Sequence, residues 1–456
     1  MAFEAGEEDW PFDTACQGIL SREFCCRRRL AAARIGVHEY DASIEGDLFE
    51  HYYRGEAGKA SRRAFAQAMG TLGHFYVRQY EHGHRAVLSV VAAEEDNLLA
   101  AWRIAQEHAL WDCVIGAMQG LRILYEGTAP TAAWRRLVES VVPHLVDPVT
   151  DGPIAGCDEE WGFINDYRVQ IALDQQRDWG EAERLQLRRV DWDRKNAKRA
   201  LEVPADTWDE THRSLIRRLA VGLHLFAQIK REKGDSACAT AYLEALELAR
   251  SIGDKAMQAA CAFNLGSAYM DVSGLRDLDE AEGWYRRSLD LFAAADSSGR
   301  ANALSQLGKL AGLRFLEART TNCPPEELAL HLTKAAQLSE QSLELTPQTD
   351  IRSRAVTCNQ LGNIYGEAGN TDRALKHYQE AVRYNEQAGD IFIAGSIRYN
   401  VAITLVRSGR LHDALAYAQA ALANHQEFGE RAVAEIQETE RLIAWIKEAQ
   451  AKERGT

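Results

Sequence analysis

The sequence predicts an all-α solenoid built from antiparallel helix pairs. Three observations support this fold class. Small and aromatic residues recur in a fixed frame along the second half of the chain, Ala-rich helical periodicity runs almost throughout, and proline is scarce, with 9 in 456 residues. One helix pair of this kind cannot bury its apolar face alone, so stacked neighbours are expected to share one continuous core.

The frame is clearest between Ala355 and Asp390, where two amphipathic segments flank a short break. Gly369 and Asn370 form that break and suit a left-handed helix end. Small side chains in both segments allow close approach of the two helices, and tyrosines fill the space around them. The packing positions predicted in this way are Leu361, Gly362 and Tyr365 in the first helix and Ala374, Tyr378 and Ala381 in the second.

The same frame recurs on both sides of this stretch. Gly362 lies 40 residues before Ala402, and Phe226 lies 40 residues before Gly266. Equivalent packing positions in the other repeats are Leu225, Ile229, Cys238, Tyr242 and Ala245; Leu265, Tyr269, Ala281, Tyr285 and Ser288; Leu307, Gly308, Ala335, Ser339 and Ser342; and Val401, Leu405, Ala414, Ala418 and Ala421. The period of about 40 residues is typical of one helix pair per repeat.

One step between repeats is longer than the others. Gly308 and Gly362 are 54 residues apart, and we attribute the difference to an insertion between Ala311 and Ala335 that contains Pro324-Pro325. Upstream, a degenerate repeat fits at Val169, Leu173 and Ala182, with Asp178-Trp179-Gly180 as its turn. The pattern therefore tolerates irregular members at two places.

The frame resembles the tetratricopeptide repeat (TPR), in its longer form with a Gly-Asp turn between repeats. This resemblance implies a TPR-type alpha-alpha superhelix, right-handed and with about six helix pairs. The segments predicted on this basis are an N-terminal lead-in with a basic helix (1–46), an N-terminal helical region (47–146), a TPR solenoid (163–430) and a C-terminal capping helix (431–456). A loop over residues 147–162, with two prolines and three glycines, separates the second segment from the third.

A second resemblance concerns residues 94–105, which combine an acidic start, Asn97-Leu98 and an apolar face that includes Trp102. This run resembles the helix that opens the C-terminal helical sensor of signal-transduction ATPases with numerous domains (STAND), a group that includes bacterial transcription regulators with TPR tails. The likeness continues through helices expected at 111–125 and 132–145. The ATPase module of that family is expected to be missing, because Lys59 and Lys309 are followed by Ala and Leu, which do not complete a phosphate-binding loop.

Composition limits the kinds of partner. The net charge of −14 disfavours general binding to nucleic acid. Apolar runs are too short for a transmembrane helix, and the acidic N-terminus does not resemble a signal peptide. Nine scattered cysteines fit reduced thiols in a cytoplasmic protein. We therefore expect a cytoplasmic protein without nucleic acid or membrane as partner.

Motifs for catalysis, cofactors or metals are not found, so no cofactor and no metal is expected and the protein is predicted not to be an enzyme. The zinc-protease pattern His-Glu-x-x-His and the hydrolase pattern Gly-x-Ser-x-Gly are both missing from the sequence. Cys25-Cys26, beside several arginines, could be reactive thiolates or ordinary half-buried thiols. The basic helix around Arg27 either binds an anionic partner or is a solvated face.

Two classes of function remain. In the first, the protein is a scaffold or sensor that binds a protein or peptide in the concave groove of the TPR superhelix; a bacterial peptide-pheromone receptor of TPR type is the alternative within this class. In the second, the N-terminal helical region has an enzyme activity. Saturable binding of a short free peptide, as against a folded partner, would separate the two forms of the first class.

The resemblance implies that the first helix of each pair lines the groove. Residues near the Leu-Gly pair but off its packing face would then point into it: Phe263, Asn264, Ser267, Ser305, Lys309, Asn359, Asn363, Tyr399, Asn400 and Arg407. Asparagines could bind the backbone of an extended peptide, or could instead only brace neighbouring helices. TPR domains that clamp a chain-terminal carboxylate use a lysine where this chain has Phe263, Ser305, Asn359 and Tyr399, so chaperone C-termini are not expected as ligands.

Overall fold

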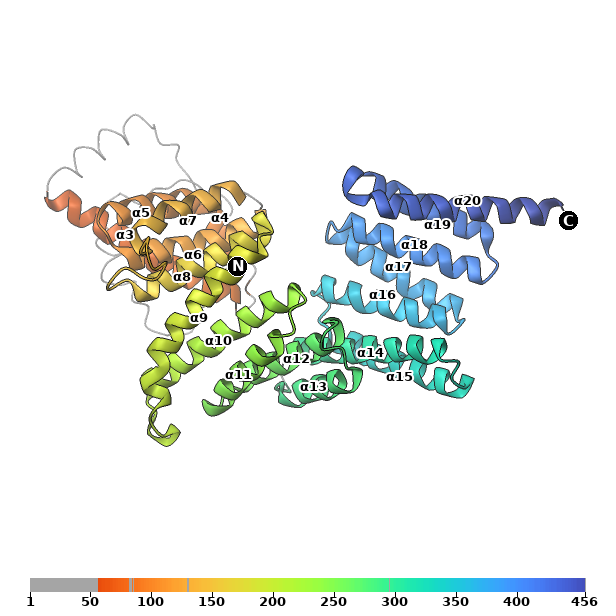
Figure 1. Ribbon diagram of the computed structural model, residues 1–456. Helices are drawn as coiled ribbons and strands as arrows, with labels where there is room; N and C mark the ends of the chain where they lie inside the picture. Colours follow the sequence, from red (N-terminus) through yellow and green to blue (C-terminus); the bar gives the residue numbers. More distant parts are fainter. Residues whose placement is uncertain (1–55, 82–83, 85, 129–130, 295, 456) are drawn as a thin grey trace, which may run out of the picture. The chain divides into compact units, whose positions relative to one another are not determined.

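The computed structural model describes residues 56–81, 84, 86–128, 131–294 and 296–455 (Figure 1). Regular structure in these ranges is helical, apart from one isolated β-bridge between Val146 and Pro153. The predicted all-α fold class is therefore confirmed. None of the helices in this part of the chain is long and apolar enough to cross a membrane. Arg27 and the Cys25-Cys26 pair lie outside the described residues.

Contacts divide the chain into two compact units, Met1–Arg189 and Val190–Thr456. The division falls inside the helix α9 (Trp179–Leu201), whereas the sequence places its boundary loop at 147–162, which lies within the first unit. The described helices of the first unit before α9 are α3 (Glu56–Glu81), α4 (Val87–Ala93), α5 (Glu95–Glu107), α6 (Trp111–Thr128), α7 (Thr131–Leu145) and α8 (Asp158–Ile171). The four segment limits drawn from the sequence stay a prediction.

Helices α3 and α6 of the first unit cross at glycines. A Cβ atom on Gly73 would lie 1.9 Å from the carbonyl oxygen of Gly116, and one on Gly70 would lie 2.9 Å from Cα of Cys113. Backbones can approach this closely only where side chains are missing from both helices. Helix α5 packs on both and buries Leu98, as its apolar face predicts.

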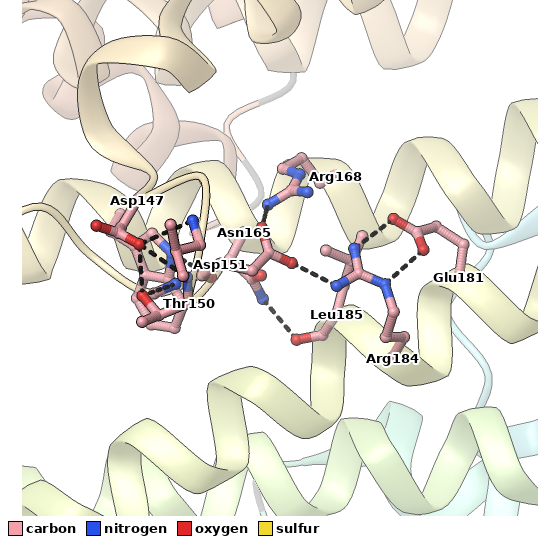
Figure 2. A network of polar contacts seen from close by, with 11 residues as sticks. Asp147, Thr150, Asp151, Asn165, Arg168, Glu181, Arg184 and Leu185 are labelled. Carbon is pink, nitrogen blue, oxygen red and sulfur yellow. Dashed lines mark hydrogen bonds and ion pairs between the residues drawn. The ribbon is translucent and has the colours of Figure 1, made fainter.

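The loop between α7 and α8 is held in place by two aspartates (Figure 2). The carboxylate of Asp147 accepts hydrogen bonds from the backbone N–H groups of Thr150 and Val149, which closes the turn. Asp151 has a left-handed backbone (φ 57°), and its carboxylate accepts hydrogen bonds from Arg168 at 2.8 Å and Arg184 at 2.6 Å. Because these arginines lie on α8 and α9, the aspartate ties the loop to both helices. α8 begins at Asp158, so the loop is shorter than expected.

The second unit is a series of helix pairs that follow one another along the chain. Antiparallel partners contact each other within each pair, and each second helix contacts the first helix of the next pair. The pairs are α10 (Glu210–Glu232) with α11 (Cys238–Ser251), α12 (Lys255–Asp271) with α13 (Leu278–Leu291), α14 (Ser297–Thr320) with α15 (Pro325–Leu345), α16 (Ile351–Glu367) with α17 (Thr371–Gln387), and α18 (Ile391–Arg407) with α19 (Leu411–Gln426). This arrangement confirms the predicted helix pairs.

Turn chemistry explains where these helices begin and end. Gly253, Gly369, Gly389 and Gly409 follow helix ends with φ between 73° and 77°, a conformation that suits glycine. Aspartates then begin the first helix of each pair, and the carboxylates of Asp209, Asp254, Asp296 and Asp350 accept a backbone N–H of the first turn. Each such cap stabilises its helix by about 1 kcal/mol.

The predicted insertion between Ala311 and Ala335 is present as extra helix rather than as a loop. α14 has 24 residues and α15 has 21, against 17 in α16. Only Thr321–Pro324 separate the two long helices, with Asn322 in the left-handed region (φ 54°) and Pro325 as the first residue of α15. Pro at this position suits a helix start, because its missing N–H needs no partner there.

Small residues at the predicted packing positions let each pair approach closely. Gly266 lies against the ring of Tyr285 and Gly362 against that of Tyr378, and all four residues are buried. The last helix, α20 (Val433–Gly455), packs on α19 and places Ile443 and Ile446 in the core of the final repeats. It begins two residues later than predicted, after a short 3-10 turn at Gly429–Ala432.

First helices of successive pairs also contact one another: α10 contacts α12, α14 contacts α16, and α16 contacts α18. The second helices of successive pairs make less contact than this. α12 and α14 are linked by the ion pair between Asp271 and Lys309. We call the five first helices of the second unit the first-helix face (α10, α12, α14, α16 and α18).

Candidate functional site

A cavity of about 340 Å³ opens on the first-helix face, where α10, α12 and α14 meet. Four residues predicted from the sequence line it, namely Phe263, Asn264 and Ser267 from α12 and Lys309 from α14. The remaining lining residues are Arg231, Glu232, Asp271, Val272 and Gln306. Three successive repeats thus contribute side chains to one site.

An ordered polar network forms one wall of this cavity. Nη1 of Arg231 donates to Oδ1 of Asn264 at 2.8 Å. The amide nitrogen of Asn264 lies 3.2 Å from Nε2 of His224 and also donates to the carbonyl oxygen of Ala260. With all its polar atoms engaged and only 8% of its surface exposed, Asn264 braces α10 against α12. For this residue the structure favours the bracing role over direct ligand binding.

His224 is the buried end of that network. Its Nδ1 lies 3.5 Å from Sγ of Cys261, and its ring packs edge-on against Tyr242. Burial, with a smaller contribution from the charge of Arg231, lowers the pKa of His224 to about 4. The imidazole is therefore neutral at pH 7, and its Nε2 lone pair can accept from the Asn264 amide.

α12 also contributes a hydroxyl group and an aromatic ring to this cavity. Oγ of Ser267 lies 3.0 Å from the hydroxyl of Tyr285, and the ring of Phe263 meets the Tyr285 ring edge-on at 5.5 Å. Ser267 is buried and Phe263 is half-buried. Phe263 thus offers an apolar contact, while the serine hydroxyl is held in a fixed position.

The charges at the cavity are paired with one another. Arg231 contacts Glu232 at 2.6 Å, and Nζ of Lys309 lies 3.4 Å from a carboxylate oxygen of Asp271. Both partners of the second pair are about half exposed, so this ion pair is weak in water. A ligand carboxylate can exchange with Asp271 at Lys309 for little energy.

The other predicted residues lie further along the first-helix face. Ser305 donates to Oε1 of Gln360 at 2.9 Å. Asn363 is exposed and accepts from the Tyr378 hydroxyl at 2.8 Å, whereas Oδ1 of half-buried Asn359 has no hydrogen-bond partner among the described residues. Asn363 therefore keeps hydrogen-bonding capacity at the surface that Asn264 has lost, whereas the unpaired Oδ1 of Asn359 is a buried atom.

At the C-terminal end of the face, Arg407 on α18 reaches back to α16. Its Nη1 donates to Glu367 at 2.6 Å, and Arg319 of α14 donates to the other carboxylate oxygen. Tyr399 and Asn400 are half-buried, and the pKa of Tyr399 is raised by burial and by the nearby charge of Glu438. Since Glu438 belongs to α20, the structure places Tyr399 beside the capping helix and not with the cavity residues.

Arg231, Asp271 and Glu367 are functional candidates that the sequence analysis does not name. All three stand five residues after the same frame position of their repeat, which is Phe226, Gly266 and Gly362 respectively, as Arg407 does after Ala402. Applying that one offset to every repeat would have found them. Val356 was also missed: its side chain is 56% exposed on α16, three residues before Asn359 and seven before Asn363, which places it on the same helix face.

Comparisons with known proteins match one family. Residues 353–427, which span α16 to the end of α19, match the model of the tetratricopeptide repeat. No curated protein matches the chain.

Several solved structures are similar to this chain. One is the apo form of the quorum sensor NprR from B. thuringiensis, at 17% identity over 76% of this chain and 80% of that one, with a TM-score of 0.42. Another is a Rap protein complexed with Competence and Sporulation Factor, at 13% identity over 85% and 99%, TM-score 0.42. A third is the STAND protein with a tetratricopeptide repeat sensor from Pyrococcus horikoshii, at 14% identity over 88% and 56%, TM-score 0.45.

Proposed function

We propose, from the premise that this chain is a tetratricopeptide repeat protein, that the first-helix face of its second unit binds an extended peptide or protein segment. In this proposal the protein is a regulatory scaffold or sensor without catalysis of its own. The observation that supports it is the cavity of about 340 Å³ to which three successive first helices contribute side chains.

The chemistry of the face suits an extended chain. The exposed amide of Asn363 offers hydrogen bonds to a peptide backbone, whatever side chains the peptide has, and half-buried Asn359 lies one turn before it on α16. Phe263 and Val356 offer apolar contacts for the peptide's side chains. Such a mixture of polar and apolar groups is typical of pockets that orient a ligand through a few fixed polar atoms.

Charge adds a preference for acidic side chains in the ligand. Lys309 and Arg407 are both exposed on this face. Each is paired with a carboxylate of a neighbouring first helix, so a ligand acid has to exchange with Asp271 or Glu367. We therefore expect moderate affinity that falls as salt concentration rises.

The proposal is tested by site-specific photo-cross-linking. A photoreactive phenylalanine analogue replaces Phe263 in one protein and Val356 in a second, and each is irradiated in extract of the native host. The matched control replaces Lys376, an exposed residue on the second helix α17. Adducts at Phe263 and Val356 but not at Lys376 are expected, and mass spectrometry then identifies the partner.

The same experiment separates the two forms of the proposal. If the cross-linked protein is heavier than the free protein by the mass of a short peptide, the protein is a peptide receptor. A synthetic copy of that peptide should then bind the protein saturably. An adduct with a whole protein indicates a scaffold. Cross-linking at Lys376 alone would move the binding surface to the second helices and contradict the proposal.

A further inference from the structure

Three side chains with metal-ligand chemistry lie together between the two helices of the central repeat. Cys358 belongs to α16, and His377 and Glu380 belong to α17. The thiol sulfur, a ring nitrogen of the histidine and a carboxylate oxygen all lie within 4.8 Å of one another. Sγ of Cys358 donates to Oε2 of Glu380 at 3.6 Å.

The packing around His377 fixes the direction of its ring. The imidazole stacks on the Tyr365 ring, with centroids 5.6 Å apart and planes within 9° of parallel. The hydroxyl of Tyr365 donates to Glu340 at 2.5 Å and accepts from Arg373 at 2.9 Å, so the platform under the histidine is itself held. Nδ1 of His377 is buried and has no hydrogen-bond partner among the described residues. A buried nitrogen of this kind is normally satisfied by a donor, an acceptor or a metal.

We propose that Cys358, His377 and Glu380 bind a zinc ion, with the fourth position of a tetrahedron left to water or a ligand. Thiolate, imidazole and carboxylate are all zinc ligands in proteins, and this mixture favours zinc over magnesium or calcium, which prefer oxygen alone. A thiolate and a carboxylate together neutralise the two charges of the ion, so the loaded site buries no net charge.

Binding requires one proton to leave. Cys358 is fully buried, and burial together with the charge of Glu380 raises the pKa of its thiol to about 12. When zinc binds, the thiol proton of Cys358 passes to solvent. Zinc then forms a bond to the sulfur in place of the hydrogen bond that the thiol donated to Glu380. Burial lowers the pKa of His377, which favours the neutral form of the ring that binds a metal.

The ligands also have to move closer, because zinc bonds of about 2.0–2.3 Å draw ligand atoms nearer than 4.8 Å. His377 and Glu380 are half-buried and stand three residues apart on one face of α17, so their side chains can adjust from the same helix. The metal then joins α16 to α17 in the repeat that also contributes Asn359 and Asn363 to the first-helix face.

Cobalt is the probe that reports the site directly, because a cobalt–thiolate bond gives a near-ultraviolet charge-transfer band and tetrahedral cobalt an intense visible band. The titration uses the full chain, freed of metal, with Cys25 and Cys26 changed to serine so that this adjacent pair does not bind the probe. We expect one equivalent of cobalt to produce both bands and zinc to displace it.

Variants test the assignment. Cys358→Ser should abolish the charge-transfer band, and His377→Ala and Glu380→Gln should each weaken zinc binding by at least about tenfold in calorimetric titration. The control is Cys261→Ser. The Cys261 thiol is buried 3.5 Å from His224 and lies outside this cluster, so this variant should bind zinc with the same affinity as the parent protein.

A readout that does not depend on cobalt is thermal melting, where zinc should raise the melting temperature of the parent and of Cys261→Ser but not of His377→Ala. Circular dichroism checks that each variant is folded. If Cys358→Ser does not fold, Glu380→Gln still tests the proposal, because Glu380 is only half-buried. Missing bands in the parent, or equal zinc affinity in parent and Glu380→Gln, would overturn the proposal.

Discussion

A Cβ atom on Gly362 would lie 2.4 Å from Cδ1 of Tyr378, a separation that side chains do not tolerate. The Tyr378 ring therefore occupies the space that the missing side chain leaves in α16, and its hydroxyl donates to Asn363 on the same helix. Gly362→Ala should destabilise the protein by about 1–3 kcal/mol, because the ring has to shift in a packed core. Urea unfolding measures the difference.

Gly283→Ala is the matched control for that substitution. Gly283 also lies inside a helix, α13, but a Cβ atom there would meet nothing within 4 Å. Removing a helical glycine at an open position should stabilise the protein by about 0.5–1 kcal/mol. If both alanine variants unfold like the parent, the packing assigned to the repeat is incorrect.

Glu282 on α13 should contribute to stability in a pH-dependent way. Burial alone would raise the pKa of this carboxylate. Its contacts with Lys334 at 2.9 Å, Arg286 at 2.7 Å and Arg314 outweigh burial and hold the pKa at about 2, against an ordinary value of 4.5. Since the folded pKa is the lower one, the stabilisation is complete above pH 4.5 and is lost as pH falls toward 2.

The measurement compares Glu282→Gln with the parent by urea unfolding at several pH values. Arg286 and Lys334 are partly exposed, so solvent screening reduces the effect, and we expect a cost of about 1–2 kcal/mol at pH 7. That cost should shrink between pH 4.5 and pH 3. Glu440→Gln, at an exposed position in α20, should stay within about 0.5 kcal/mol of the parent at every pH.

His224 should make stability fall over a different pH window. The pKa of His224 is about 4 in the folded protein, against an ordinary value of 6.5 that applies to the unfolded chain. Between pH 4 and pH 6.5 the unfolded chain therefore binds a proton at this residue more readily than the folded protein does. Stability should be complete above pH 6.5 and should decline by about 1–3 kcal/mol as pH falls to 4. His224→Gln should flatten that slope, whereas His412→Gln, at an exposed position, should leave it unchanged.

Much of the second unit could be predicted from the sequence because its packing follows a local frame. Leu361, Tyr365, Ala374 and Ala381 are all buried at the positions that helical periodicity assigns, and the Gly-Asp turns end and begin helices where the pattern indicates. The interpretation of the Cys323-Pro324-Pro325 region as an insertion was also correct, although it adds helical turns to α14 and α15 rather than a loop.

Contacts between distant residues were not predictable in this way. The cluster of Cys358, His377 and Glu380 joins two helices and has no linear spacing motif, and the bracing of Asn264 depends on Arg231 and His224 from the preceding repeat. A sequence shows which face of a helix a residue occupies. It does not show which side chain of the neighbouring helix takes its hydrogen bonds.

The paired variant Asn359→Ala with Asn363→Ala tests whether the first-helix face binds the partner. Oδ1 of Asn359 has no hydrogen-bond partner among the described residues, so its removal breaks no such bond. The Tyr378 hydroxyl donates to Asn363, and in the variant it can donate to water instead, because Asn363 is exposed. The melting temperature should therefore change little. Affinity for the partner identified by cross-linking should fall about tenfold, or 1.4 kcal/mol, as measured by fluorescence anisotropy.

Asn264→Ala provides the contrast, because its amide contacts Arg231 and His224 in a buried network and its loss should lower the melting temperature. Unchanged affinity in the Asn359 and Asn363 double variant would place the binding surface away from α16. A fall in melting temperature as large as that of Asn264→Ala would instead show that these asparagines brace helices, since a residue that only meets the ligand contributes nothing to folding of the free protein.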